Sequence, residues 1–509
     1  TINDFHGRIE ANGDEVGAAV LAGAVDAAEA ENPNTLFVSA GDNIGASTFT
    51  SFIQDDEPTI DALVAAGLDV SAVGNHEFDR GFADLTDRVI PRYGSDELAL
   101  GANVYEKGTT TPALREYSVK TVDGVRVAFI GTVTTDTATM VSPDGIADIE
   151  FGDQLAAANR VAAEIADGDL ADVTVLLTHS GSATSDDCDV VASDPSAFGD
   201  LVRGASDEID AIVSAHTHQT YACEVAAPGG DTRPVIQAAE YGTALGRLEL
   251  EVDRSSKELL SITGATETLA EGGYEPDAEV ADIVADAAAF AEVEGSEQVG
   301  QISGDILRGG TEGSDRGVES SLGNWVADVY LWATSNEDYS GTPAQIALMN
   351  PGGLRADLLR GDDGIVTYRE AADVQPFANT LVTVPLTGAQ LEAVLEQQWK
   401  AEGERPKLHL GVSDGFSYEY TEAAPLPGET VGRSGDVTSM TYQGEAVQPD
   451  DVFTVVTNSF LAAGGDGFAA FADGTVRTDT GQIDLAATVD YFASRDVVDP
   501  APLGRAAKV

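Results

Sequence analysis

Five of the six histidines in this chain of 509 residues lie in short polar segments that also contain aspartates and an asparagine. The segments are Asn3-Asp4-Phe5-His6, Gly41-Asp42-Asn43, Gly74-Asn75-His76-Glu77-Phe78-Asp79, Thr178-His179-Ser180 and Ala215-His216-Thr217-His218. Imidazole and carboxylate groups together suit zinc, manganese or iron, and paired ions of this kind hydrolyse phosphate esters. The sequence therefore indicates a site for two divalent metal ions with a hydrolytic chemistry.

Seven side chains in these segments are candidate metal ligands: Asp4, His6, Asp42, Asn75, His179, His216 and His218. We expect the Asp-x-His and His-x-His pairs to direct both side chains to one face, because an extended chain has a period of two residues. The carboxylate of Asp42 could bridge the two ions with one oxygen each. Each segment alone is more often a polar surface or a turn, but all five together favour a metal site.

The elements that would position these ligands are short apolar runs alternating with Ala-rich helical patterns. Buried strands are predicted over residues 36–39, 70–73, 125–130, 173–177 and 211–214, and helices over 17–32, 58–67 and 153–167. This alternation is typical of a layered α/β domain. The polar segments follow the strands, so they should gather at the carboxyl ends, where open α/β sheets bind their ligands.

The second half of the sequence has a different composition and a different pattern of predicted elements. An Ala/Glu/Asp-rich amphipathic helix is predicted over residues 280–293, and we interpret it as a linker. Beyond it, helices over 320–335 and 387–400 and strands over 346–349 and 452–457 predict a mixed α+β domain. The predicted organisation is a first domain over residues 1–268, a linker helix over 269–297 and a second domain over 298–509.

Composition excludes several classes of partner. With 87 acidic and 27 basic residues, the net charge of −60 repels nucleic-acid backbones and anionic lipid surfaces. No apolar run is long enough to span a bilayer. We therefore expect neither a nucleic-acid partner nor a membrane span. His409 lies outside every motif and is expected to be an ordinary surface or partly buried residue.

The two cysteines are relevant to the cellular compartment, because a disulfide would indicate an oxidising one. Cys188 follows His179 and Cys223 follows His218, so loops at one sheet edge could bring them together. A disulfide and two unpaired small side chains are about equally expected. The sequence has no signal peptide and opens at what should be the end of a strand, as a processed exported protein would, and so would a deliberately shortened chain.

The five segments resemble the signature of the calcineurin-like metallophosphoesterases, which runs Asp-x-His, Gly-Asp, Gly-Asn-His-Glu/Asp, His and Gly-His-x-His. Asn-Asp-Phe-His-Gly-Arg and Gly-Asn-His-Glu-Phe-Asp resemble more narrowly the secreted and periplasmic 5′-nucleotidases and their UDP-sugar hydrolase relatives. The resemblance implies a secreted, periplasmic or cell-surface protein with a four-layer α/β/β/α first domain and two divalent ions, zinc or manganese before others. Ala215 replaces the glycine that usually precedes the first histidine of the last segment.

The same resemblance divides the ligands and assigns a catalytic pair. One metal would be held by Asp4, His6, Asp42 and His218, and the other by Asp42, Asn75, His179 and His216. His76 would stabilise the phosphoryl transition state and assist departure of the alkoxide. Asp79 would accept the second N–H of His76 and hold its tautomer, although a helix N-cap is the alternative role for Asp79.

The second domain resembles the nucleotide-binding C-terminal domain of 5′-nucleotidases. The motifs are Arg316-Gly-Val-Glu-Ser-Ser-Leu-Gly-Asn324, Asn350-Pro-Gly-Gly-Leu-Arg355, Gln-Pro-Phe377 and Phe460-Leu-Ala-Ala-Gly-Gly-Asp466-Gly-Phe468. By resemblance, Arg316, Asn350 and Arg355 contact phosphate and ribose, Phe377 and Phe460 clamp the base, and Asp466 accepts the ribose hydroxyls. Asn75 is expected to reach the substrate as well as a metal. The sequences Asn-Pro-Gly-Gly and Pro-Phe-Ala-Asn differ from the usual motifs of the family, and these differences could alter loop shape and substrate preference.

The predicted function is hydrolysis of nucleoside 5′-monophosphates by in-line attack of a metal-activated water, with hinge motion at the linker releasing product. A 2′,3′-cyclic nucleotide phosphodiesterase and a UDP-sugar or NAD diphosphatase are alternatives on the same site. A surface protein that binds nucleotides without catalysis is a further alternative. The sequence does not predict the oligomeric state.

Overall fold

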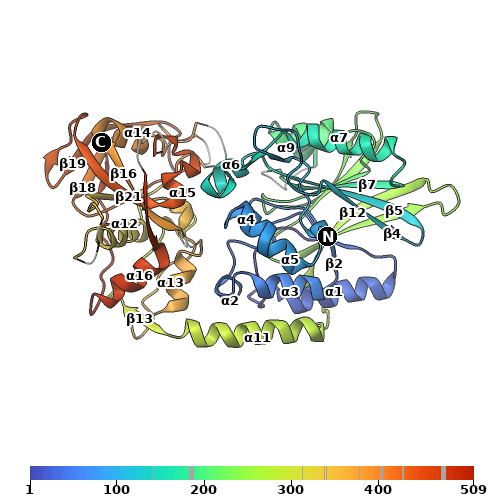
Figure 1. Cartoon of the computed structure of the whole chain (residues 1–509), viewed down its shortest axis with the longest axis horizontal. Coiled ribbons are helices and arrows are strands. Elements are labelled where there is room, and N and C mark those ends of the chain that lie inside the picture. Colours follow the sequence, from blue (N-terminus) through green and yellow to red (C-terminus); the bar gives the residue numbers. More distant parts are fainter. Residues whose placement is uncertain are drawn as a thin grey trace. The chain divides into compact units, whose positions relative to one another are not determined.

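The computed structural model of the chain (Figure 1) divides into two compact units, Thr1–Ala291 and Glu292–Val509. The structure describes residues 1–141, 143–182, 188–311, 313–337, 339, 341–377, 379–401, 405–426, 429–471 and 477–509. The domain boundaries predicted at residues 268 and 297 stay a prediction.

The first unit contains a mixed sheet of six strands in the order β4-β5-β7-β8-β10-β9. The strands are β4 (Tyr117–Val122), β5 (Val125–Val133), β7 (Val173–His179), β8 (Ala211–Ser214), β9 (Thr220–Ala226) and β10 (Thr232–Ala238). The four inner strands run parallel, and the two outer strands run antiparallel to their neighbours. Strand β7 is buried along its whole length, and a strand covered on both faces reads as an unbroken apolar run.

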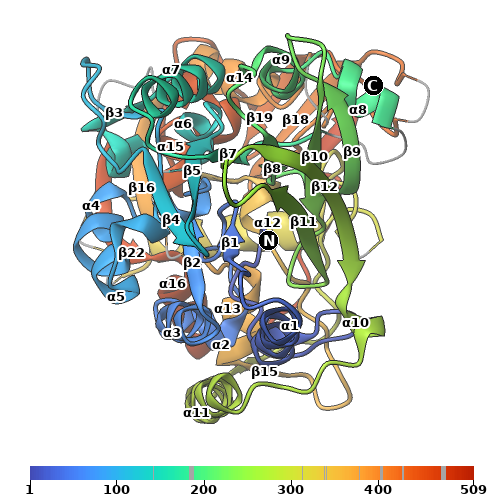
Figure 2. The ribbon, with the colours of Figure 1, turned by 90° about the vertical axis from the view of Figure 1, so that its right-hand side faces the viewer.

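A second layer of strands packs on this sheet. It comprises the parallel pair β1 (Phe37–Ser39) and β2 (Leu68–Ser71) and the hairpin of β11 (Ala244–Val252) and β12 (Leu259–Thr268). Figure 2 shows the hairpin beside β9 and β10. Buried apolar side chains of both layers form one core between them, which includes Val38, Val70, Val175, Val213 and Ile236.

Helices cover the outer faces of both strand layers. Leu21 of α1 (Gly17–Glu31) and Leu63 of α3 (Glu57–Ala65) pack in one core with Phe37 of β1. Val161 of α7 (Gln154–Asp167) and Leu201 of α9 (Ala197–Gly204) belong to the core on the opposite side, with residues of the six-stranded sheet. These two helices lie side by side in Figure 2. The order of layers is α/β/β/α, which confirms the predicted fold class.

Helix α11 (Ala278–Gly295) follows the hairpin and contains the predicted linker helix. Its N-terminus is fixed to the first unit because Asp277 donates its backbone N–H to Ala19 and accepts the N–H of Val280 on its side chain. Val280 and Ala287 are buried in the core that contains α1. Among the described residues, no helix combines the length and the apolar composition that a membrane-spanning segment requires.

The second unit is a mixed α+β domain, as the sequence predicts. A five-stranded sheet has the order β17-β14-β21-β16-β22, and a four-stranded sheet has the order β20-β19-β18-β23. The first comprises β14 (Ile346–Met349), β16 (Thr380–Thr387), β17 (Gly411–Val412), β21 (Val452–Asn458) and β22 (Thr478–Ile483). The second comprises β18 (Phe416–Glu422), β19 (Gly435–Tyr442), β20 (Glu445–Ala446) and β23 (Ala506–Lys508). The unit also contains the two-stranded sheet of β13 (Gln298–Gln301) and β15 (Ile365–Thr367). Its α-helices include α12 (Ser321–Ala333), α13 (Tyr368–Val374), α14 (Gly388–Glu396), α15 (Ser459–Ala462) and α16 (Asp484–Ala493).

His409 is buried in this unit, so the expectation of a surface or partly buried residue is wrong. Its side chain is 4% exposed, and neither ring nitrogen has a hydrogen-bond partner. The ring lies near the Tyr418 and Tyr420 rings, and burial lowers the pKa of His409 to about 3. Nearby, the buried Lys407 ammonium donates to Glu422 Oε2 at 3.1 Å. The ring of His409 is thus neutral in the folded protein.

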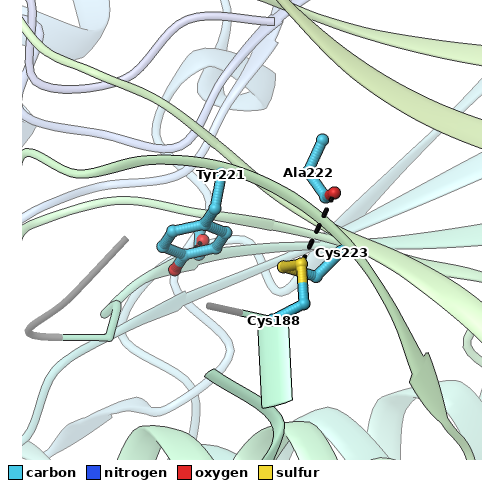
Figure 3. Close-up of a disulfide and its surroundings, with 5 residues drawn as sticks. Cys188, Tyr221, Ala222 and Cys223 are labelled. Atoms are coloured by element: carbon cyan, nitrogen blue, oxygen red, sulfur yellow. Dashed lines mark hydrogen bonds between the residues drawn. A yellow bond between two sulfur atoms is a disulfide. The ribbon is translucent and has the colours of Figure 1, made fainter. Parts of the chain in front are cut away.

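Cys188 and Cys223 form a disulfide, which the sequence left undecided. Figure 3 shows it joining the first residue of α8 (Cys188–Ser193) to strand β9, beside Tyr221. Residues 183–187, which precede Cys188, lie outside the described part of the chain. The bond ties the segment that follows His179 to the strand that follows His218. It therefore fastens two segments that leave the candidate metal site.

We predict that removing this disulfide lowers the stability of the first unit. A bond that closes a separation of 35 residues is worth about 3–4 kcal/mol through the entropy of the unfolded chain. Urea unfolding of the double variant Cys188→Ala/Cys223→Ala, with EDTA present so that bound metal does not contribute, measures the loss. A reducing agent should destabilise the wild type to the same level and leave the variant unchanged. Equal midpoints for oxidised wild type and variant would contradict the prediction.

Candidate functional site

The five polar segments of the first unit meet at the carboxyl ends of its parallel strands. Asp4 and His6 follow Ile2, which bridges to β1; Asp42 follows β1; Asn75 and His76 follow β2; His179 ends β7; His216 and His218 follow β8. One carboxylate oxygen, Asp42 Oδ2, lies 3.0 Å from His179 Nε2 and 3.8 Å from His6 Nε2. The predicted convergence is therefore present in the structure.

The possible ligand atoms form overlapping groups. Asp4, His6 and His218 make one group, Asp42, His179 and His216 make a second, and His6, Asp42 and His76 make a third, each with ligand atoms within 4.8 Å of one another. The first two groups agree with the division of ligands that the sequence predicts, with Asp42 adjoining both. Asn75 is buried, and its Oδ1 has no hydrogen-bond partner, as a neutral metal ligand would require. Which of these atoms bind metal stays a prediction.

The orientation of two histidines shows that this donor set fits a cation. His6 Nδ1 lies 2.8 Å from the carbonyl oxygen of Gly45, and His179 Nδ1 lies 3.0 Å from that of Ala40. Each Nδ1 must carry a hydrogen, so in the neutral ring each Nε2 presents a lone pair to the site. For His179 that lone pair faces a carboxylate oxygen at 3.0 Å. Two acceptors at this distance require a proton or a metal ion between them.

The electrostatics of the site also favour added positive charge. Burial is the largest influence on His6 and His216 and lowers their pKa values to about 3 and 4. Burial opposes protonation of His179 as well, but the carboxylates of Asp42 and Asp4 outweigh it and raise the pKa of His179 to about 9. The pKa of Asp42 stays below its usual range despite burial, because of the surrounding histidines. A divalent cation would supply the charge that these carboxylates attract.

The backbone at the ligands corrects one part of the sequence argument. Five of the seven predicted ligands, Asp4, His6, Asp42, His216 and His218, have φ angles between 48° and 75°. These residues are in the left-handed region and not in extended strand, so a period of two cannot explain why Asp4 and His6, or His216 and His218, converge. Left-handed backbone costs a non-glycine residue roughly 1 kcal/mol or more, and such strain clusters at functional sites.

Glu77 is a positioning residue that the sequence argument missed. Its carboxylate accepts the backbone N–H groups of Asp42 at 3.0 Å, Asn43 at 2.9 Å and Gly74 at 2.6 Å. Asp42 in turn accepts the N–H of His76 on Oδ1 at 2.8 Å. A Cβ on Gly74 would lie 2.1 Å from Asp42 Oδ1, so only glycine permits this approach. Glu77 was visible in its motif, but nothing in the sequence shows which N–H groups it would accept.

His76 and Asp79 lie in a short turn beside the ligands. His76 Nδ1 is 2.8 Å from Asp79 Oδ2, and both side chains are about one-fifth exposed, at 20% and 16%. The His76 ring is 5.0 Å from that of His6 between centroids. Its place in the third ligand group also makes it a possible metal ligand. Asp79 caps no helix with its side chain, and its contact to His76 agrees with the orienting role expected of it.

The predicted substrate residues of the second unit form two contacting sets. Asn350 Nδ2 donates to Asp466 Oδ2 at 2.9 Å. A Cβ on Gly352 would lie 3.1 Å from Asp466 Oδ2 and 3.6 Å from a terminal nitrogen of Arg316, so these three side chains surround that glycine. In the other set, the Arg355 guanidinium lies 5.8 Å from the centre of the Phe377 ring.

Aromatic and cationic groups complete this region. Phe377 and Phe460 are partly exposed, unlike the core residues Phe468 and Phe471, which are fully buried. Burial and, after it, the charges of Arg405 and Arg355 lower the pKa of Arg316 to about 9. Neighbouring guanidinium groups repel one another, so their gathering favours an anion.

Lys400 is a further residue that the sequence did not indicate, and it acts on the backbone of the Asp466 loop. Its ammonium donates to the carbonyl oxygen of Asp466 at 2.6 Å and lies 4.3 Å from the centre of the Phe468 ring. Asp466 has a left-handed backbone, with φ of 56°. Ala378, part of a departure from the expected motif, lies outside the described residues.

Comparison with known proteins matches both halves of the chain. A family model described as calcineurin-like phosphoesterase matches residues 1–220, and a model described as the 5′-nucleotidase C-terminal domain matches residues 298–473. A solved structure, the 5′-nucleotidase precursor of Thermus thermophilus, is 26% identical with a TM-score of 0.74. The match covers 100% of this chain and 98% of that one.

Two curated relatives are longer than the chain. Endonuclease YhcR of Bacillus subtilis is 31% identical over 523 residues, which cover 97% of this chain and 39% of the relative. Cell wall protein Lmo0130 of Listeria monocytogenes is 30% identical over 514 residues, which cover 92% of this chain and 63% of the relative. The chain thus spans less than two thirds of either.

We predict that Asp42 is needed for both metal ions and His218 for one. Asp42→Asn should reduce bound metal from about two ions per chain to well below one, because a single carboxylate adjoins both ligand groups. His218→Asn should leave about one ion. Elemental analysis after dialysis against buffered zinc or manganese measures both, with Asp79→Asn as the control that retains two. Equal losses from Asp42→Asn and His218→Asn would contradict a bridging role.

Proposed function

The chain belongs to the 5′-nucleotidase family of calcineurin-like phosphoesterases, and from that premise we propose that it hydrolyses nucleoside 5′-monophosphates to nucleoside and phosphate. We base this on one observation above others: Asp42 lies 3.0 Å from His179 of one group of metal-type ligands and 3.8 Å from His6 of the other. Hydrolysis of phosphate esters is what such paired sites perform. The nucleotide as substrate is supported by the residues of the second unit.

The proposed roles in the first unit follow from the contacts there. One ion would be held by Asp4, His6, Asp42 and His218, and the other by Asp42, Asn75, His179 and His216. When bound, the two ions would polarise the phosphate and lower the pKa of the attacking water.

His76 would act on the phosphate as it reacts. The Asp79 carboxylate accepts the Nδ1–H, and in the imidazolium form the ring would donate its Nε2–H to a phosphoryl oxygen. Since His76 is 20% exposed, its ring can be reached by substrate.

The proposed roles in the second unit rest on complementary chemistry. Guanidinium groups of Arg316 and Arg355 suit phosphate oxygens, and the Asp466 carboxylate suits the two ribose hydroxyls. Phe377 and Phe460 offer partly exposed rings on which any base can stack. Asn350 is 2% exposed and donates a hydrogen bond to Asp466. We therefore propose that Asn350 orients the Asp466 carboxylate, in preference to contacting the substrate directly.

We also propose that the protein works outside the cytoplasm. The disulfide between Cys188 and Cys223 supports this, because such bonds persist in oxidising compartments. One relative carries the name of a cell wall protein, which agrees with that location.

A substrate panel tests the proposed activity. With zinc or manganese present, we expect release of phosphate from AMP to exceed turnover of UDP-glucose, NAD and 2′,3′-cyclic AMP in kcat/KM. Single-stranded DNA belongs in the panel because one relative is named an endonuclease, although a net charge of −60 opposes binding of polyanions. Preference for a diester or a diphosphate would replace the proposal with that activity. Nucleotide binding without turnover in the presence of any metal would indicate a protein of this fold that binds nucleotides without catalysis.

We predict that His76→Ala lowers kcat for AMP by about a hundred- to a thousandfold, because a donor to the developing charge is lost. Bound metal should remain at the wild-type level in elemental analysis. Asp79→Asn should give a smaller loss, since it removes only the group that orients His76. Parallel loss of metal and activity in His76→Ala would instead make His76 a ligand, as the third group of possible ligands allows.

A further inference from the structure

Each aromatic ring of the proposed base site lies two residues after a buried polar side chain. Gln375 precedes Phe377, and Asn458 precedes Phe460. Gln375 and Asn458 are each 1% exposed, whereas the two rings are partly exposed. The segments belong to different parts of the fold, since Gln375 follows α13 and Asn458 ends β21. The distance between the two rings therefore depends on contacts that join these two segments.

Tyr330 of α12 provides a link between the two segments. Its side chain is fully buried, and its hydroxyl accepts a hydrogen bond from Gln375 Nε2 at 2.8 Å. Asn458 also acts electrostatically on this hydroxyl, since it opposes the rise that burial causes in the pKa of Tyr330. Tyr330 is thus hydrogen-bonded to the residue that precedes one ring and interacts with the residue that precedes the other.

The link continues on the side of Phe460. Asn458 Oδ1 accepts the backbone N–H of Leu461 at 2.8 Å, which caps the short helix that carries Phe460. Asn458 Nδ2 donates to Asn350 Oδ1 at 2.9 Å, and Asn350 donates to Asp466. Movement of the Asn458 amide would therefore shift both the ring and the carboxylate proposed to bind ribose.

The link is also anchored on the side of Phe377. Gln375 Oε1 accepts from the Thr488 hydroxyl of α16 at 2.9 Å. The preceding residue, Val374, accepts the backbone N–H of Arg355 at 2.9 Å on its carbonyl oxygen. The segment with Phe377 is thus held by Tyr330 and α16 together, and it carries the phosphate-binding candidate Arg355 with it.

We propose that Tyr330 is a positioning residue that sets the separation of Phe377 and Phe460 and thereby the affinity for the base. The inference rests on the proposed function, in which these rings hold the base. Removing the hydroxyl leaves the buried Gln375 amide without its acceptor, and an unsatisfied buried donor is costly enough to move the segment that carries it. Tyr330 touches no part of the substrate in this scheme.

The test compares Tyr330→Phe with a matched control in the same unit. Tyr418 is also a buried tyrosine whose hydroxyl accepts from a glutamine, Gln398 Nε2 at 3.1 Å. Tyr418→Phe therefore removes a tyrosine–glutamine bond that does not involve the segments of Phe377 and Phe460, and Gln398 Nε2 keeps the carbonyl oxygen of Leu395 as an acceptor. We expect Tyr330→Phe to raise the KM for AMP and the Kd for adenosine roughly three- to tenfold. The KM for ribose 5-phosphate should rise by a smaller factor than the KM for AMP, because this ligand responds only to the shift of Asp466 and Arg355 and has no base that stacks on the rings.

Further measurements separate positioning from mere stabilisation. If Tyr330 acts through Gln375, the double variant Tyr330→Phe/Gln375→Leu should bind adenosine no more weakly than Gln375→Leu alone. Equal adenosine affinities for Tyr330→Phe and Tyr418→Phe would overturn the inference, and so would equal changes in KM for AMP and ribose 5-phosphate. Adenosine binding by calorimetry needs no turnover, so a wild type that binds adenosine without hydrolysing AMP would reject the proposed function while this test proceeds. A wild type that does not bind adenosine would reject the inference itself.

Discussion

The position of the Asp42 carboxylate constrains the whole of the first unit. It must lie beside imidazoles that come from separate strand ends, and it does so within 3.0 Å of His179 and 3.8 Å of His6. Three features make this possible: the absence of a side chain at Gly74, the left-handed backbone of Asp42, and the three N–H groups that Glu77 accepts. Buried carboxylates and strained backbone are costly by themselves, so metal binding should stabilise the fold as well as supply chemistry.

Charge distribution poses a second constraint. A chain with 87 acidic and 27 basic residues repels an anionic substrate at long range. Near Asp466 the balance is reversed locally, because Arg355 and Arg405 lie close enough to the buried Arg316 to lower its pKa. Metal ions would reverse it in the first unit as well. Under the proposed function, the acidic surface would oppose the binding of polyanions such as nucleic acid, while a small nucleotide would need only the local cationic groups.

The sequence predicted what depends on residue type and local period. Strands β8 and β14 and helix α1 were predicted to within one residue, because their apolar runs have one clear interpretation. The ligand types were predicted for a similar reason, although the extended geometry expected at Asp4 and His6 was wrong. Contacts between distant segments could not be predicted, which is why the disulfide stayed undecided and the burial of His409 was missed. The role of Glu77 depends on three backbone groups that no sequence pattern specifies.

The two units solve the same positioning problem in the same way. In the first, Glu77 is buried beside the metal ligands and fixes the loops that carry Asp42 and Asn75. In the second, Asn458 is buried beside a proposed substrate contact and caps the helix that carries Phe460. Each oxygen and nitrogen of both side chains makes at least one hydrogen bond to the protein, so we assign both residues to positioning and not to ligand binding. A buried polar network of this kind is rigid only while every member is satisfied. Substitutions at such residues should therefore impair function through geometry, even where every side chain that contacts the ligand is unchanged.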